Sequence, residues 1–412
     1  MINPSGNPIP LLRFEEYSAL WKLQKLNSIA EIKRGAGSQY IKYVSNPRNG
    51  IRLIRIGDFL GSEPVFVEDT RDMKRFRLMK GDILIAGTGA TAGITFLVPD
   101  NFIDHAFSYN APRIRVINDS ANYLVQYLKS NLVLRQQQSL FTGLAQPFLD
   151  MRAIGGFKIH LPTLPEQQKI AAFLSAVDTK IQQLQRKKEL LEQYKKGVMQ
   201  KIFSQEIRFK NEDGNDYPDW EERSLGDVGD VSKLAGYEFT KHILYESKGE
   251  IIALRGLNIK NNSLDLSNVK YIDNSELGKL GRSKLYIDDL MFTYIGTIGE
   301  VALIKEDNRF YLAPNVSRIR LNKDIANPLF VIQHFNLPRF KQREVKKYIS
   351  SSSQPALTMG NVRKFLIHLP TLEEQNKIAS YLGTVDKCAN LIGKQIGGIN
   401  HFKKGLLQQM FI

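Results

Sequence analysis

The chain of 412 residues contains one cysteine, Cys388. A single thiol cannot form an internal disulfide, and no Cys/His spacing in the sequence is typical of a zinc site. We interpret Cys388 as a small residue on a helix, and we expect a reducing, cytoplasmic compartment. Residues 1–10 show neither a charged segment nor an apolar run, so no signal peptide is predicted.

Long apolar runs are also missing. The longest uncharged run, residues 83–99, contains three glycines and three threonines. Such a composition makes a poor membrane span and a better pair of strands. We therefore expect no membrane partner.

The motifs of common enzyme classes are absent. The sequence has no phosphate-loop lysine motif, no histidine pair with metal-ligand spacing and no Gly-x-Ser-x-Gly elbow. It also lacks the Asn/Asp-Pro-Pro-Tyr/Phe element of methyl transfer to a base amine, and a nuclease core. We predict no catalytic residue, no metal site and no cofactor in this chain.

Two features could suggest chemistry, and both have a structural interpretation. Residues 87–92 loosely fit a dinucleotide-binding glycine pattern, but that pattern must open a helix. Here residues 94–98 are typical of a strand, so a hairpin is predicted and a nucleotide-binding enzyme is the weaker hypothesis. His160 and His368 occupy matching places just before two predicted helices, and we interpret them as structural.

The charge balance favours a polyanionic partner. Lys and Arg number 57 against 42 Asp and Glu, which gives a net charge of +15. Such a surplus is typical of proteins that bind nucleic acid, although a basic surface alone also fits a merely basic soluble protein.

An internal repeat determines the organisation of the chain. Residues 146–203 align without a gap with residues 354–411, at an offset of 208. Upstream the similarity is fainter. It includes a Leu/Ile-Arg-Phe segment followed by tryptophan (12–21 and 207–220), the segments 81–84 and 288–291, and the pairs Arg113/Arg115 and Arg318/Arg320. Because these arginines recur in both copies, we predict for them a DNA-backbone or structural role rather than base choice.

The repeated segment predicts a long helix in each copy. Thr163-x-x-Glu166 and Thr371-x-x-Glu374 are capping boxes that follow a proline. Apolar residues then recur with the 4-3 spacing of a coiled-coil seam. The predicted seam and docking residues are Ile170, Leu174, Val177, Ile181, Leu184 and Leu191, and in the second copy Ile378, Leu382, Val385, Ile392, Ile396 and Ile399.

Each helix is the simplest partner for the other. A pseudo-two-fold axis favours an antiparallel pair, since parallel helices would require a long return of the chain. The second helix contains Gly383, Gly393, Gly397 and Gly398. Each glycine costs about 1 kcal/mol of helix propensity, so packing must stabilise this helix.

Two lysines, Lys195 and Lys403, occupy equivalent seam positions. We expect their side chains to extend along the helix to its surface. The alternative is that they fix the register of the helices as buried polar residues do.

The predicted fold class is α+β. Two mixed α/β domains of similar fold are joined by two long helices packed as an antiparallel coiled coil with pseudo-two-fold symmetry. The predicted boundaries are an N-terminal segment 1–20, a first domain 21–162, a helix 163–205, an acidic linker 206–219, a second domain 220–370 and a helix 371–412. Strands are expected at 51–56, 82–86, 94–98, 251–254, 290–295 and 301–304, and helices at 123–138 and 328–348.

Both domains carry the residue types that duplex DNA requires. Lys and Arg neutralise phosphates, while Arg, Gln, Asn and Ser reach base edges. The predicted DNA-binding residues are Lys33, Arg34, Gln39, Tyr40, Arg48, Arg52, Arg71, Lys74, Arg75, Arg77 and Gln146 in the first domain, and Lys233, Tyr237, Lys241, Arg255, Arg282, Lys284, Ser351, Ser352 and Gln354 in the second.

The tandem of a divergent domain and a similar helix resembles the specificity subunit of type I restriction–modification systems. The Leu161-Pro-Thr-Leu-Pro-Glu-Gln-Gln-Lys-Ile170 helix start, its second copy and the upstream matches carry this resemblance. It implies that each domain is a target recognition domain reading one half of a bipartite, asymmetric site in double-stranded DNA. The helices would act as spacer and docking site for two modification subunits.

The resemblance also implies where the chemistry occurs. Modification subunits would carry S-adenosylmethionine and methylate adenine, and restriction subunits would add ATP- and Mg-dependent translocation and cleavage. The chain itself would be non-catalytic. The alternative function is a coiled-coil scaffold or adaptor whose basic surface is incidental and which reads no DNA sequence.

Overall fold

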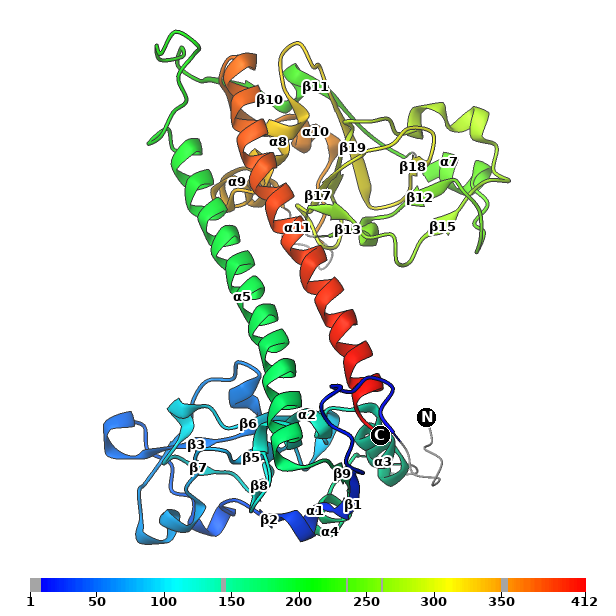
Figure 1. Cartoon of the computed structure of the whole chain (residues 1–412). Coiled ribbons are helices and arrows are strands. Elements are labelled where there is room, and N and C mark those ends of the chain that lie inside the picture. The colour runs from blue at the N-terminus through cyan, green and yellow to red at the C-terminus, as the bar shows by residue number, and fades with distance from the viewer. Residues whose placement is uncertain (1–8, 142–145, 235, 261, 350–354) are drawn as a thin grey trace. The chain divides into compact units, whose positions relative to one another are not determined.

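The computed structural model describes residues 9–141, 146–234, 236–260, 262–349 and 355–412 (Figure 1). The chain divides into two compact units. Unit 1 comprises Met1–Arg186 with Gly393–Ile412, and unit 2 comprises Lys187–Ile392. Each unit therefore contains a segment of both long helices.

Unit 1 is built on a four-stranded antiparallel sheet in the order β2 (Ala30–Lys33), β8 (Arg113–Val116), β5 (Ile83–Ile85), β6 (Thr95–Leu97). A three-stranded sheet has the order β4 (Phe66–Val67), β3 (Ile51–Ile54), β7 (Ala106–Phe107), and β3 and β7 are parallel. Strand β1 (Lys22–Lys25) pairs with β9 (Lys158–Leu161). The shorter α-helices are α1 (Leu26–Ile29), α2 (Ala121–Leu128), α3 (Asn131–Phe141) and α4 (Met151–Gly155).

Unit 2 repeats this order. Its four-stranded sheet runs β11 (Gly229–Lys233), β19 (Val316–Leu321), β16 (Leu290–Thr293), β17 (Val301–Leu303), and its three-stranded sheet β15 (Lys270–Tyr271), β12 (Ile252–Leu254), β18 (Phe310–Leu312). Strand β10 (Glu221–Ser224) pairs with β20 (Leu366–Leu369), and β13 (Ile259–Lys260) pairs with β14 (Ser263–Leu264). Its shorter α-helices are α6 (Leu225–Val228), α7 (Gly236–His242), α8 (Pro328–Phe335), α9 (Pro338–Phe340) and α10 (Met359–Arg363).

Short 3₁₀ helices complete the connections. They are Ser38–Tyr40, Pro47–Asn49, Ile56–Phe59, Arg71–Phe76, Gly89–Thr91 and Asp100–Phe102 in unit 1, and Gly256–Asn258, Leu277–Ser283 and Lys346–Tyr348 in unit 2, where Lys341–Val345 forms a π-helix. The predicted mixture of helix and strand is thus confirmed.

The predicted helices 123–138 and 328–348 were too long. The first is two helices, α2 and α3, separated at Lys129 and Ser130. The second ends at Phe335 and a new helix begins at Pro338. Proline lacks the N–H that would continue the helical hydrogen bonds, and it disfavours helical backbone at the residue before it.

The glycines of residues 87–93 form a hairpin, as predicted. Strands β5 and β6 pair antiparallel on either side of them. Gly89 and Gly93 have φ of 77° and 89°, a region that other residues rarely adopt. A Cβ on Gly93 would also lie 2.3 Å from the amide oxygen of Gln137. These glycines therefore serve a tight turn and a close contact, and they do not open a helix.

The two long helices are α5 (Leu164–Phe203) and α11 (Leu372–Met410). Helix α11 is continuous through its five glycines, which are Gly383, Gly393, Gly397, Gly398 and Gly405. In unit 1, Ile170 and Leu174 of α5 share a core with Leu406 and Met410 of α11. In unit 2, Met199 and Ile202 share a core with Ile378 and Leu382. All twelve predicted seam residues are buried or half-buried.

The seam lysines do not extend to the surface as expected. In unit 2, Lys195 Nζ lies 2.7 Å from Asp386 Oδ1, and in unit 1, Lys403 Nζ lies 2.5 Å from Asp178 Oδ1. The lysine side chains are only 19% and 13% exposed. The two ion pairs occupy equivalent places in the repeat, and within each unit they join helix segments that run in opposite directions.

Candidate nucleic-acid interface

A buried glutamate anchors the start of each long helix. Glu166 accepts hydrogen bonds from Arg13 Nε (2.7 Å) and Nη2 (2.8 Å) and from Trp21 Nε1 (3.2 Å). Its copy, Glu374, accepts from Arg208 Nη2 (2.8 Å) and Trp220 Nε1 (3.2 Å).

This arrangement corrects the capping-box interpretation of the glutamate side chains and explains the repeated Arg…Trp segment. A charge with no exposed surface is tolerated only when it is paired and hydrogen-bonded, and the arginine and the tryptophan supply those partners.

The next residue connects each long helix to the domain that precedes it. Gln167 accepts a hydrogen bond from Ser120 N–H (2.9 Å), at the N-terminus of α2, and donates one to Pro162 O (3.0 Å). Gln375 accepts from Asn327 N–H (2.8 Å), at the N-terminus of α8, and donates to Pro370 O (2.9 Å). The Glu-Gln pair of the repeat therefore connects the start of each long helix to its domain by hydrogen bonds.

The repeated arginines have a structural role. Arg115 donates two hydrogen bonds of 2.7 Å to the buried Asp82, and Arg320 donates two of 2.7 Å to Asp289. The hydrogen bonds to Asp82 raise the pKa of Arg115, and those to Asp289 raise the pKa of Arg320. Burial lowers the pKa of Arg113, which pairs with Glu31. Of the two roles predicted for these arginines, contact with the DNA backbone or a structural role, the observed contacts fit the structural role.

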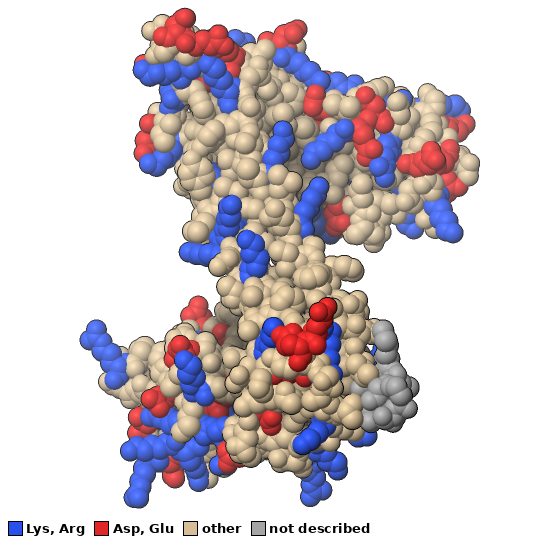
Figure 2. All heavy atoms as spheres, in the orientation of Figure 1, with Lys and Arg blue, Asp and Glu red and all other residues tan. Residues whose placement is uncertain are grey.

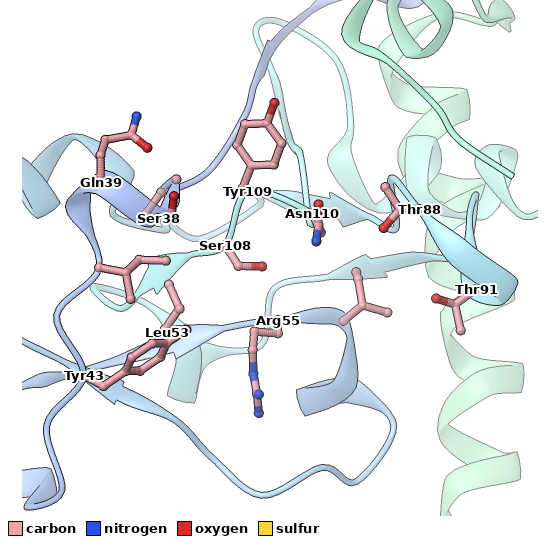
Figure 3. Close-up of a pocket in the computed structure, with 14 residues that line it drawn as sticks. Ser38, Gln39, Tyr43, Leu53, Arg55, Thr88, Thr91, Ser108, Tyr109 and Asn110 are labelled. Atoms are coloured by element: carbon pink, nitrogen blue, oxygen red, sulfur yellow. The ribbon is translucent and has the colours of Figure 1, made fainter. Parts of the chain in front are cut away.

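A hollow of about 830 Å³ lies in the first domain (Figure 3). It opens between the 36–43 loop, β3, the 88–91 turn and the segment 108–110. Figure 3 shows these segments arranged around one space, with Ser108 and Asn110 near its middle, Gln39 and Tyr109 pointing to one side and Arg55 to the other. Within the described part of the chain, several of these polar side chains make no hydrogen bond, namely Ser38, Gln39, Thr88, Thr91, Ser108 and Asn110. Such groups remain available to a ligand.

Arginines near the hollow lie on aromatic rings. The Arg34 guanidinium lies 4.6 Å from the ring centre of Tyr109, a residue of the hollow, and 5.6 Å from that of Phe148. Arg75 lies 4.3 Å from the ring centre of Tyr40, and its Nη2 also lies 3.9 Å from Asp72 Oδ1, so of the two arginines only Arg34 is held by aromatic rings alone among the described residues. An aromatic face holds a cation in place without cancelling its charge, whereas a carboxylate cancels it. Figure 2 shows basic side chains projecting from the part of unit 1 that contains β3 and β7, with acidic ones between them.

The structure separates the predicted DNA-binding residues into two groups. Some are held by partners within their own unit: Lys33 by Glu31, Arg52 by Asp58, Arg77 by Asp69, Arg255 by Asn268, Lys233 by the Tyr294 ring and Lys284 by the Tyr286 ring. Others are exposed and have no such partner among the described residues: Gln39, Arg48, Arg71, Lys74, Gln146, Tyr237 and Lys241. Arg282 lines a second hollow, in unit 2. Ser351, Ser352 and Gln354 lie outside the described residues.

Thr88, Thr91, Ser108 and Asn110, which line the hollow, were not among the predicted DNA-binding residues. Thr88 and Thr91 belong to the turn of residues 87–93, where the glycines and not the threonines predict the hairpin. Ser108 and Asn110 belong to a Ser-Tyr-Asn segment between two apolar strands, a signal that a search for polar loops could have found.

Comparison with known proteins identifies the family. The family model described as "Type I restriction modification DNA specificity domain" matches residues 19–193 and 217–401, well over half of the chain. This chain belongs to that family. The resemblance inferred from the sequence is thereby confirmed, and with it the predicted function of a type I DNA specificity subunit.

Relatives in this family include two type I restriction enzyme specificity subunits of Methanocaldococcus jannaschii. The MjaX subunit is 29% identical over 218 residues, which are 51% of this chain and 49% of that protein. The MjaVIII subunit is 24% identical over 344 residues, 81% of this chain and 79% of that protein. The crystal structure of the type I restriction–modification S subunit from M. genitalium has a TM-score of 0.61 at 13% identity, covering 98% of this chain and 99% of that one.

No helix in the described ranges combines the length and the apolar character that crossing a membrane requires.

Proposed function

We propose that this chain reads a bipartite, asymmetric target in double-stranded DNA, one half with each recognition domain. The proposal rests on one observation. The two units have the same sheet order, but they differ in the residues by which the turn after β5, or after β16 in unit 2, pairs with a later segment of the chain. Thr88, which lines the hollow, pairs with Phe148, whereas its counterpart Ile295 pairs with Ala356. A common frame with different surface chemistry suits two different half-sites.

We propose further that α5 and α11 pair as an antiparallel coiled coil that sets the distance between the half-sites. The repeat-equivalent ion pairs Asp178–Lys403 and Lys195–Asp386 support one register for both halves. The same helices would dock two modification subunits. Those subunits would bring S-adenosylmethionine, restriction subunits would bring ATP and Mg, and the chain itself would perform no chemistry.

Exchanging residues 22–160 for those of another specificity subunit tests this function. We expect one half-site of the methylated target to change and the other half-site and the spacer to stay the same. Methylome sequencing of cells carrying the chimaera and its modification subunits measures this. A scaffold without DNA reading would leave the methylated sequence unaltered, and it would give no footprint in the presence of the modification subunits.

Replacing Gln39 or Asn110 by alanine should relax specificity at one half-site. An amide that pairs with adenine in the major groove discriminates by about 1–3 kcal/mol, which corresponds to roughly 5- to 150-fold. Competition binding with duplexes mutated one base pair at a time measures the loss. The control is Gln168→Ala, an exposed glutamine on α5, which should leave all base preferences unchanged; equal effects of all three variants would contradict a reading role for the hollow.

A further inference from the structure

A second hollow, of about 560 Å³, lies in unit 2 between β11, β19, the 3₁₀ helix Leu277–Ser283 and α10. Five cationic side chains line it, together with one carboxylate. They are Lys233, Arg282, Arg318, Arg320 and Arg363, with Asp230. This concentration of positive charge differs from the first hollow, where a single arginine, Arg55, lies among neutral side chains.

Within the described ranges, two of these five cations are paired with a carboxylate. Arg320 pairs with Asp289 at 2.7 Å, and Arg318 pairs with Asp230. Among the described residues, Lys233, Arg282 and Arg363 have no carboxylate partner: Lys233 lies 5.2 Å from the ring centre of Tyr294, and Arg363 Nη2 donates to a backbone oxygen at 2.6 Å. Five cations against two carboxylates leave about three positive charges, which an anion would balance.

Buried donors at this hollow also lack acceptors. Arg318 is 7% exposed, and its Nε has no hydrogen-bond partner in the described part of the chain. The Ser232 hydroxyl, on the neighbouring strand position, is likewise buried without a partner. A buried donor without an acceptor costs free energy, so such groups beside a cavity indicate an acceptor-rich ligand.

The pair of strands that lines this hollow, β11 and β19, has an equivalent in unit 1, the pair β2 and β8. In the β2–β8 pair, Arg113 lies opposite Lys33 and Arg115 lies opposite Glu31. In the β11–β19 pair, Arg318 lies opposite Ser232 and Arg320 lies opposite Asp230. The Nε of Arg113, like that of Arg318, is buried and has no hydrogen-bond partner among the described residues. Two domains that read different bases still share one chemical task, which is contact with the uniform DNA backbone. The pair of arginines that β8 and β19 share is suited to contact with the DNA backbone.

We propose that the hollow of unit 2 binds a phosphate group, and that its source is a phosphodiester of the DNA backbone. This inference rests on the proposed function for the source of the phosphate. Arginine provides planar paired donors that match phosphate oxygens, and Lys233 adds a point charge. The contact anchors the domain without selecting a base.

The test uses Arg282→Ala, because the side chain of Arg282 makes no hydrogen bond to the described residues. Arg282→Lys keeps the charge, and Arg309→Ala is a control that removes an exposed arginine paired with Glu306. Each complex with its modification subunits is titrated with a target duplex and a scrambled duplex over a salt series. For Arg282→Ala we expect the slope of log affinity against log salt to fall by about 0.9, equally on both duplexes. Arg282→Lys and Arg309→Ala should keep the wild-type slope.

A second arm examines phosphate itself. Thermal unfolding of the full chain is compared in sodium phosphate and in sodium chloride of equal ionic strength, and we expect phosphate to stabilise the wild type more than Arg282→Ala. If Arg282→Ala and Arg309→Ala give the same slope of log affinity against log salt, the DNA backbone is not the source of the phosphate. This holds even if free phosphate stabilises the chain. A loss confined to the target duplex also overturns the assignment to the DNA backbone, because that would be base reading. If the wild type shows no preference for the target, the proposed function fails, while the slope on the scrambled duplex still decides this site.

Discussion

Four residues inserted between Ile181 and Leu191 of α5, matched by four between Ile392 and Ile399 of α11, should lengthen the DNA spacer by about two base pairs. Four helical residues add about 6 Å of length, and B-form DNA rises about 3.4 Å per base pair. Both insertions lie between the ion pairs Asp178–Lys403 and Lys195–Asp386, so both pairs can be retained. Methylome sequencing should show both half-sites unchanged and methylation of the original target lost.

Two controls separate the spacer from simple damage. An insertion in α5 alone moves one ion pair out of register with the other, so we expect less methylation overall. Four residues inserted at 211–219, outside both helices, should leave the spacer unchanged. An active complex that carries the matched insertions and still methylates the original spacing would contradict the role of the helices as a ruler.

Glu166→Ala should destabilise unit 1 by about 3–5 kcal/mol, because it leaves the arginine charge of a buried pair without its partner. Glu166 has no exposed surface and binds both Arg13 and Trp21. Glu374→Ala should have the same effect on unit 2 through Arg208 and Trp220. Glu166→Gln keeps an oxygen acceptor but loses the charge, so its effect should be intermediate.

The two tryptophans of the chain allow each unit to be followed separately. In a Trp220→Phe background, denaturant unfolding monitored by fluorescence reports on Trp21 and therefore on unit 1. Asp100→Ala is the control within unit 1, since its pair with Lys80 is exposed and spans 3.8 Å. Such an exposed pair contributes about 0.2–1 kcal/mol. Equal effects of Glu166→Ala and Asp100→Ala would contradict the anchoring role.

Local patterns in the sequence were sufficient for the elements with strong periodicity. The 4-3 spacing predicted α5 and α11 within two residues of their observed ends, because a buried stripe recurs at each turn of such a helix. Apolar runs bounded by glycine predicted the β5–β6 hairpin. The apolar residues of 328–348 suggested one helix, but Pro338 at the centre of this segment cannot continue the helical hydrogen bonds, so α8 ends at Phe335 and α9 begins at Pro338.

Contacts between residues far apart in the sequence could not be predicted from such local patterns. Lys195 meets Asp386, 191 positions later in the chain, and Arg13 meets Glu166 across 153 positions. Asp386 and Glu166 both lie in the repeated segment, but the residues next to each of them in the sequence do not indicate which distant residue it contacts. The polar hollow was missed for the same reason, since its residues come from four separate segments.

The sequence by itself determined that this chain is two copies of one plan, a recognition domain followed by a long helix, because repeated periodicity and repeated motifs are properties of order along the chain. It also determined that positive charge is in excess. Only the tertiary structure decided where that charge is available. Among the residues that the structure describes, Arg52, Arg77, Arg115 and Arg320 are paired with carboxylates, whereas Arg34 and Arg282 are not. Ion pairing depends on distance in space, which the order of residues does not state.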